Sequence, residues 1–181
     1  MKTIIIGNVG SGAYVFFRYL IFKEESKNFL VVDEIGNKEL IELQNNNSFK
    51  SLFYNYDKNF EGITYKDIKE YKVDKVYINA PNKFEIDYNW LLEENDDILR
   101  VSINDLTLEL KKHLNKFDNV FIFNPCNKID KNYLANSFSL YYEEILSFSD
   151  NRKDEYIAIN KEEIKHSILK LDKNFKIGLD D

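Results

Sequence analysis

Short apolar runs alternate with segments of helical periodicity along most of this chain. Residues 3–6 are apolar and rich in β-branched side chains, and they stop at Gly7, which is typical of a strand buried on both faces of a parallel sheet. Residues 13–25 have apolar positions at helical spacing, with Lys23 and Glu24 placed for water. Residues 29–32 form a second apolar run. The chain therefore opens with a predicted strand–helix–strand unit.

The same alternation continues to the C-terminal end of the chain. It predicts strands at 63–65, 75–80, 98–101, 119–124, 156–159 and 175–177, and helices at 38–44, 66–71, 84–94, 103–117, about 134–145 and 161–171. This order indicates an α/β fold that is Rossmann-like and doubly wound, a mostly parallel sheet with helices on both faces in three α/β/α layers. We expect residues 1–147 to form the nucleotide-binding domain and residues 148–181 a C-terminal β-α-β tail that packs on it.

Composition narrows the classes of partner. The 181 residues carry a formal net charge of -6 and no basic stripe, which argues against nucleic acid. Cys126 is the only cysteine, so neither an internal disulfide nor a thiolate zinc cluster is expected, and a reducing compartment fits. No apolar run is long enough for a signal peptide or a membrane span. These features predict a cytoplasmic protein with no membrane partner and no metal site, and they leave a homo-oligomer open.

The glycine-rich turn after the first strand is the main candidate for chemistry. In an open parallel sheet it lies at the carboxyl edge, where the following helix offers backbone N–H groups and the positive end of its dipole to a phosphate. A tight turn with no ligand is the structural alternative. The predicted phosphate-binding residues are Gly7, Asn8, Val9, Gly10, Ser11 and Gly12.

One interpretation of this turn is a degenerate P-loop. Gly7 and Gly12 have the spacing of G-x-x-x-x-G-K-[ST], but Ala13 and Tyr14 occupy the Lys and Ser/Thr positions. The charge on the β- and γ-phosphates and the hydroxyl on Mg²⁺ would both be missing, so triphosphate hydrolysis by the usual route is disfavoured.

The other interpretation is a dinucleotide site. It pairs the loop with Asp33, which ends the second predicted strand about 20 residues further on, where a carboxylate accepts hydrogen bonds from ribose hydroxyls. The loop has the order G-x-x-G-x-G in place of G-x-G-x-x-G. Both interpretations remain open at this point.

Several segments also occur in the order of a known family. The glycine turn, Val31-Val32-Asp33, residues 74–80 and residues 120–125 resemble the NAD-binding half of the lactate and malate dehydrogenases, over Met1 to about Leu134. The resemblance implies a Rossmann fold with NAD as the cofactor. It places Asp33 on the adenosine ribose, the backbone of Asn79, Ala80 and Pro81 along the cofactor, and Asn124 near the nicotinamide end.

The chain departs from that family at the catalytic residues. In the family the catalytic His lies in a second half that follows this one, in a Gly-Glu-His-Gly setting that neither His113 nor His166 has. We expect both to be ordinary surface or flank histidines, with no group placed for acid–base catalysis. The prediction is an NAD-type dinucleotide-binding domain without an evident catalytic site, in a sensing, regulatory or remnant role. The alternatives are a small NAD-dependent oxidoreductase completed by oligomerisation and a degenerate P-loop protein.

Overall fold

The computed structural model describes just over half of the chain. The described residues are 1–7, 11–24, 28–33, 50–53, 70–79, 93, 97–102, 108–123, 128–139, 142–147, 155–160 and 164–168.

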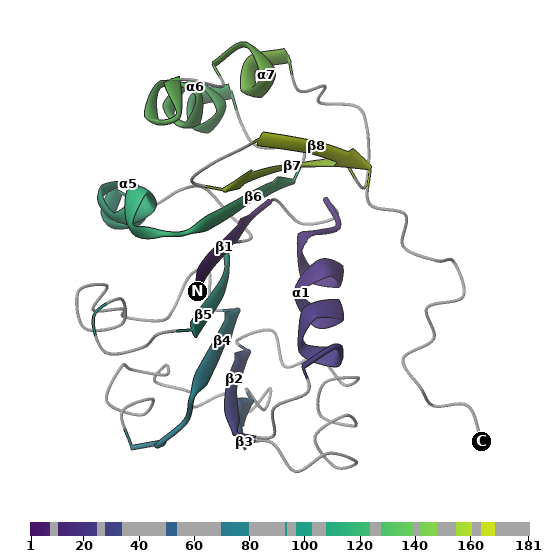
Figure 1. The fold of residues 1–181 in the computed structure, drawn as a ribbon, viewed down its shortest axis with the longest axis vertical. Helices are drawn as coiled ribbons and strands as arrows, with labels where there is room; N and C mark the ends of the chain where they lie inside the picture. The colour runs from purple at the N-terminus through teal and green to yellow at the C-terminus, as the bar shows by residue number, and fades with distance from the viewer. Residues whose placement is uncertain are drawn as a thin grey trace, which may run out of the picture.

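An eight-stranded sheet organises the described residues (Figure 1). Its strand order is β3-β2-β4-β5-β1-β6-β7-β8, and the pairs from β3 to β6 are all parallel, whereas β7 is antiparallel to both β6 and β8. The strands are β1 (Lys2–Ile6), β2 (Phe29–Asp33), β3 (Lys50–Phe53), β4 (Lys75–Asn79), β5 (Asp97–Ser102), β6 (Asn119–Phe123), β7 (Glu155–Asn160) and β8 (Ile164–Ile168).

Two apolar clusters, one on each face of the sheet, hold helices against it. On one face α1 (Ala13–Phe22) buries Phe17 and Ile21 against Ile5 and Val31. The alternation of side chains along a strand sends the intervening residues to the other face.

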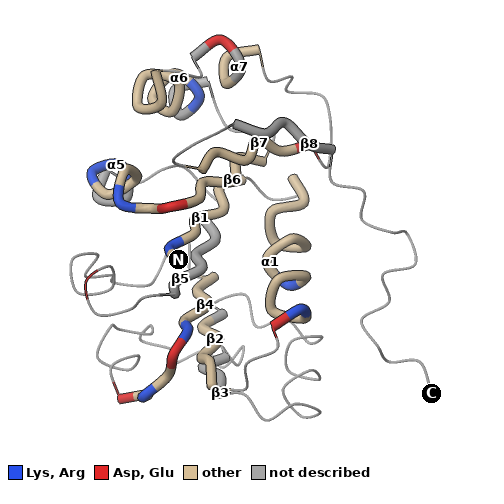
Figure 2. The backbone as a smooth tube through the Cα atoms, in the orientation of Figure 1, with Lys and Arg blue, Asp and Glu red and all other residues tan. Residues whose placement is uncertain are grey.

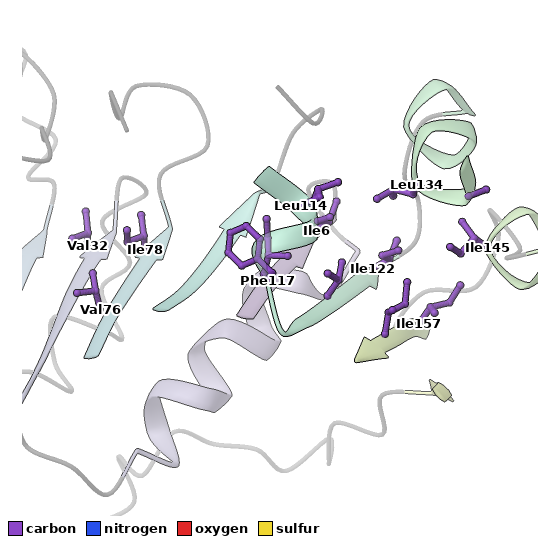
Figure 3. Close-up of a cluster of buried hydrophobic side chains, with 14 of the residues drawn as sticks. Ile6, Val32, Val76, Ile78, Leu114, Phe117, Ile122, Leu134, Ile145 and Ile157 are labelled. Atoms are coloured by element: carbon purple, nitrogen blue, oxygen red, sulfur yellow. The ribbon is translucent and has the colours of Figure 1, made fainter. Parts of the chain in front are cut away.

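That other face carries the second cluster. It joins Ile6 and Ile122 to Leu114, Leu134 and Ile145 (Figure 3). These last three residues come from the 3₁₀ turn η1 (Leu114–Lys116), α6 (Lys128–Ser137) and α7 (Tyr142–Ser147), and η1 directly follows α5 (Leu108–His113). The result is three layers, α/β/α, which confirms the predicted fold class.

The predicted strands around 3–6, 29–32, 75–80, 98–101, 119–124 and 156–159 are confirmed within one or two residues at their ends. The helix predicted at 13–25 ends at Phe22, and the apolar stretch about 134–145 contains two helices, α6 and α7. β3 is a strand that the pattern did not predict.

The C-terminal helix predicted at 161–171 is wrong. Residues 164–168 form β8, which pairs antiparallel with β7, so the described part of the tail is a two-stranded extension of the sheet. In β7 buried and half-buried positions alternate along the strand, which is the period of two of a strand with one covered face. For β8, pairing with β7 outweighs the helical propensity of the lysine- and glutamate-rich stretch before it.

Strand order separates this sheet from the dinucleotide-binding sheet that the family resemblance implies. In that fold the first two strands are neighbours, in the order 3-2-1-4-5-6. Here β5 and β4 lie between β1 and β2. The α/β/α class is therefore the predicted one, but the order of its strands is different.

Other predicted elements lie outside the described residues. These are the helix at 38–44, the strands at 63–65 and 175–177, and most of the helices at 66–71 and 84–94. Among the helices that the structure describes, none is both long and apolar enough to cross a membrane.

Candidate functional site

Gly7 stands where β1 ends, in a space that only a glycine fits. A Cβ built on it would lie 2.5 Å from the Ser11 side-chain oxygen, 2.8 Å from the Ala13 Cβ and 2.8 Å from the Phe123 Cβ. Such distances are well inside normal van der Waals contact. At Gly7, where β1 ends, the backbone therefore packs closely against β6.

Gly12 sets the start of α1. It is the N-cap residue with φ 95°, a left-handed conformation that side chains disfavour, and its carbonyl accepts the first helical hydrogen bond, from the Phe16 N–H at 2.9 Å. Ser11 is fully buried beside it, and its hydroxyl oxygen accepts a long hydrogen bond from the Ala13 N–H at 3.4 Å. The turn is thus fixed at both of its described ends.

The described end of this turn carries no charged side chain. Residues 11–17 are all uncharged, and Figure 2 shows the charged residues of α1 in its middle and at its far end. The first N–H groups of a helix have no partner within the helix, and the dipole makes that end positive. The arrangement suits an anion held by backbone groups, such as a phosphate.

Asn79 ends β4 at the same edge of the sheet. It is fully buried, and by strand alternation it lies on the same face as Tyr77, which packs in the cluster with α1. β5 lies between β4 and β1, which puts two strand spacings, about 10 Å, between the ends of these strands. Asn79 therefore adds a neutral amide to the edge where the glycine turn lies.

The structure brings together some of the predicted site residues. Gly7, Ser11 and Gly12 form the described ends of the turn, and Asn79 lies at the same edge. Asp33 ends β2, three strand spacings or about 14 Å from β1. The remaining predicted residues lie outside the described part of the chain: Asn8, Val9, Gly10, Ala80, Pro81 and Asn124.

His113 was expected to be an ordinary surface or flank histidine, and the structure shows that it does not lie at the surface. Only 7% of it is exposed, at the junction of α5 and η1 and next to the fully buried Leu114. Leu114 packs in the cluster on the face of the sheet opposite α1, so the buried histidine belongs to that layer and not to the glycine turn. Within the part of the chain that is described, no three His, Cys, Asp or Glu side chains gather where they could hold a metal ion.

Glu24 was also expected to face water, yet its side chain is only 8% exposed. Lys75 donates to its two carboxylate oxygens at 3.1 and 3.0 Å, and the Tyr77 hydroxyl donates to Oε2 as well. Sequence pattern gave no sign of this cluster, because Glu24 and Lys75 are 51 positions apart and meet only through the packing of α1 on β4. The cluster ties the C-terminal end of α1 to the start of β4.

Replacing Lys75 by methionine is expected to lower the free energy of unfolding by about 1–3 kcal/mol. The change leaves a buried carboxylate with one partner fewer, and the usual 3–5 kcal/mol for breaking a fully buried pair is reduced because 31% of the Lys75 side chain is exposed. Denaturant unfolding measures the loss. The double variant Glu24→Gln/Lys75→Met removes both charges and should recover part of it; a double variant less stable than Lys75→Met would contradict this account.

Solved structures with a similar fold include viral genome-packaging NTPases. No protein-family model and no curated protein matches the sequence. The chain is similar to the genome-packaging NTPase B204 from Sulfolobus turreted icosahedral virus 2 in complex with ATP-γ-S, with a TM-score of 0.62 and 12% identity. It is also similar to the AMPPCP complex of that protein, with a TM-score of 0.64 and 10% identity. B204, the DNA-packaging ATPase from Sulfolobus turreted icosahedral virus, has a TM-score of 0.60 and 13% identity. Each comparison covers 91% of this chain and 95% of the other.

These comparisons overturn the expectation that NAD is the cofactor. The similar structures were solved with ATP-γ-S, AMP and AMPPCP, none of them a dinucleotide. The strand order agrees with the correction, because it sets Asp33 apart from β1 where a dinucleotide site needs the two strands adjacent. The role predicted for Asp33 on the adenosine ribose depended on NAD as the cofactor and has no basis without it. At 10–13% identity, what this chain shares with the viral ATPases is the fold.

Proposed function

We propose that this chain binds an adenine nucleoside phosphate, with the phosphates against the glycine turn and the N-terminus of α1. The observation that carries the proposal is the junction of β1 and α1, where Gly7 has no room for a Cβ and Gly12 starts the helix in a left-handed conformation. Glycines at both ends of the turn let backbone N–H groups approach a phosphate. The viral NTPases with this fold were solved with adenine nucleotides, and they support the choice of ligand.

The proposed site binds without the usual catalytic groups. Ala13 stands where a P-loop has its lysine and is 1% exposed in the cluster with Phe17, and Tyr14 stands at the Ser/Thr position. Asn79 is a neutral amide at the same edge, where a carboxylate would hold Mg²⁺ more strongly. The function is therefore that of a degenerate P-loop: nucleotide binding held by backbone groups, in a regulatory or assembly role.

The proposed ligand is a nucleotide, and no nucleic-acid partner is proposed. The similar viral proteins are named for packaging a genome, but this chain carries a formal net charge of -6. Neutralisation of phosphates by Lys and Arg drives binding to nucleic acid, and an acidic chain does not favour it.

The variant Tyr14→Glu tests the site. We expect the wild-type chain to bind ATP-γ-S in calorimetry and the variant to bind at least about tenfold more weakly, because a carboxylate in the first turn of α1 repels the phosphates. The fold should survive, since a negative charge at a helix N-terminus favours the helix and Arg18, one turn later, can pair with it.

The control is the same charge change placed elsewhere. Asn132 is exposed on α6, on the other side of the sheet from α1, and Asn132→Glu should leave the affinity for ATP-γ-S unchanged. An equal loss of affinity in both variants would show that the effect comes from the change in net charge and not from the proposed site. No binding of ATP-γ-S or AMP by a folded wild-type chain would refute the proposal.

A further inference from the structure

A cavity of about 470 Å³ lies at the opposite edge of the sheet from the glycine turn. It is bounded by the C-terminal end of α1 and by the first halves of β1, β4 and β6, and Tyr77 and Phe121 in its lining belong to or pack against the cluster on the face that α1 covers. Thr3, which lines it, precedes Gly7 by four residues of extended chain, about 13 Å. The cavity and the proposed nucleotide site are therefore separate places on the molecule.

The walls of the cavity are mostly apolar. Leu20 of α1, Tyr77 of β4 and Phe121 of β6 line it, and all three belong to or pack against the apolar cluster on the face that α1 covers. Small-molecule sites are concave, mainly apolar spaces of about 300–1,000 Å³ with a few polar groups that fix orientation. The volume and the lining both match that description, and the aromatic walls favour a flat ring system.

The described polar groups of the cavity carry more positive than negative charge. Its one described carboxylate, Glu24, is already bound by Lys75 and the Tyr77 hydroxyl, while the exposed Lys23 adds a second lysine directly after α1. Lys23 lies over the Tyr19 ring at 5.8 Å, a contact that at an exposed position contributes only about 0.5–1 kcal/mol. The described lining thus offers two lysines against one carboxylate whose oxygens are occupied.

Asn119 and Thr3 form a neutral polar pair in the lining of the cavity. The Asn119 amide donates to the Thr3 hydroxyl at 3.4 Å, which joins β6 to β1 at the cavity and orients both side chains. Together with the cluster around Glu24, this pair builds the polar part of the cavity from groups that hold one another in place. A preorganised lining loses little entropy when a ligand enters.

We propose that this cavity is a second ligand site, for a small aromatic molecule that bears one anionic group. The ring system lies against Leu20 and Phe121, and the acidic group lies near Lys23 and Lys75. The site is independent of nucleotide binding at the glycine turn.

Two fluorescent probes that share one ring system test the proposal. The first, 8-anilinonaphthalene-1-sulfonate, has the proposed chemistry, and the second, N-phenyl-1-naphthylamine, lacks the sulfonate. We expect the folded wild-type chain to bind the sulfonate saturably with one site per chain. Leu20→Trp, which fills the cavity, should abolish that binding, and Asn132→Trp, on an exposed position of α6, should leave it unchanged.

The charge of the cavity is tested by Lys23→Glu. Reversal of one exposed charge should weaken the sulfonate probe about three- to tenfold and leave the neutral probe unchanged. Circular dichroism establishes that each variant is folded. Three results would each overturn the proposal: no saturable binding, equal binding in Leu20→Trp, or equal responses of the two probes to Lys23→Glu. The outcome does not depend on ATP-γ-S, so either proposal can fail while the other holds.

Discussion

Gly7→Ala is expected to lower the free energy of unfolding by about 2–3 kcal/mol, near the upper end of the usual cost of overpacking. The added Cβ would meet atoms of Ser11, Ala13 and Phe123 at 2.5–2.8 Å, and two of these three contacts are Cβ atoms that cannot rotate away. The backbone must shift instead, at the point where β1, β6 and α1 meet. Thermal unfolding should show a melting temperature about 4–12 °C lower, as a domain of this size loses roughly 2–4 °C per kcal/mol.

The control for Gly7→Ala is a pair of changes at Gly12. There the constraint is the backbone angle, φ 95°, so Gly12→Ala should cost about 1–2 kcal/mol and Gly12→Asn less, because asparagine tolerates the left-handed region. At Gly7 the constraint is space, so asparagine should be no better than alanine. A Gly7→Ala chain as stable as the wild type would contradict the close packing of the turn.

The first third of the described fold was predictable because its signals are local. β1 and β2 are continuous apolar runs, α1 has a clear helical period, and the glycines mark the turn between them. Local patterns also sufficed for the α/β/α class, since strands that alternate with helices have few other ways to bury their apolar faces.

Strand order could not be predicted in this way. Which strands become neighbours is decided by crossovers that pass over the sheet, and nothing local in β1 or β2 specifies that β5 and β4 lie between them. The choice of a dinucleotide depended on that order, since Asp33 would need to end a strand beside β1. The NAD interpretation assumed that the glycine turn and Asp33, about 20 residues apart in the sequence, also lie close together in space. The strand order of the sheet separates them.

Local sequence pattern also does not predict which charged residues near the ends of helices and strands become buried. Glu24 follows α1 among other charged residues, which is the pattern of a solvated helix end, but packing buries it against Lys75 and Tyr77. β8 was missed because five residues are too few for the period of two to outweigh its charged flanks; pairing with β7 decides it.

The chain is expected to bind ATP and not to hydrolyse it. In P-loop enzymes the lysine and the Mg²⁺ held by the Ser/Thr hydroxyl neutralise charge on the transferred phosphoryl group. Ala13 and Tyr14 supply neither, and each missing electrostatic contact typically costs roughly 10²–10³ in rate. Against the 1–100 per second of a typical phosphoryl-transfer enzyme, this leaves turnover below about 10⁻² per second.

Phosphate release from ATP measures that turnover, and the Tyr14→Glu variant separates the chain's own activity from a contaminant. Tyr14 at the Ser/Thr position carries its hydroxyl at the far end of the ring and not next to the backbone, where a P-loop Ser or Thr holds the metal, so replacing Mg²⁺ by a chelator should also change the affinity for ATP-γ-S very little. Turnover of one per second or faster that disappears in Tyr14→Glu would show that other residues supply the missing charge, and would make this chain an active NTPase.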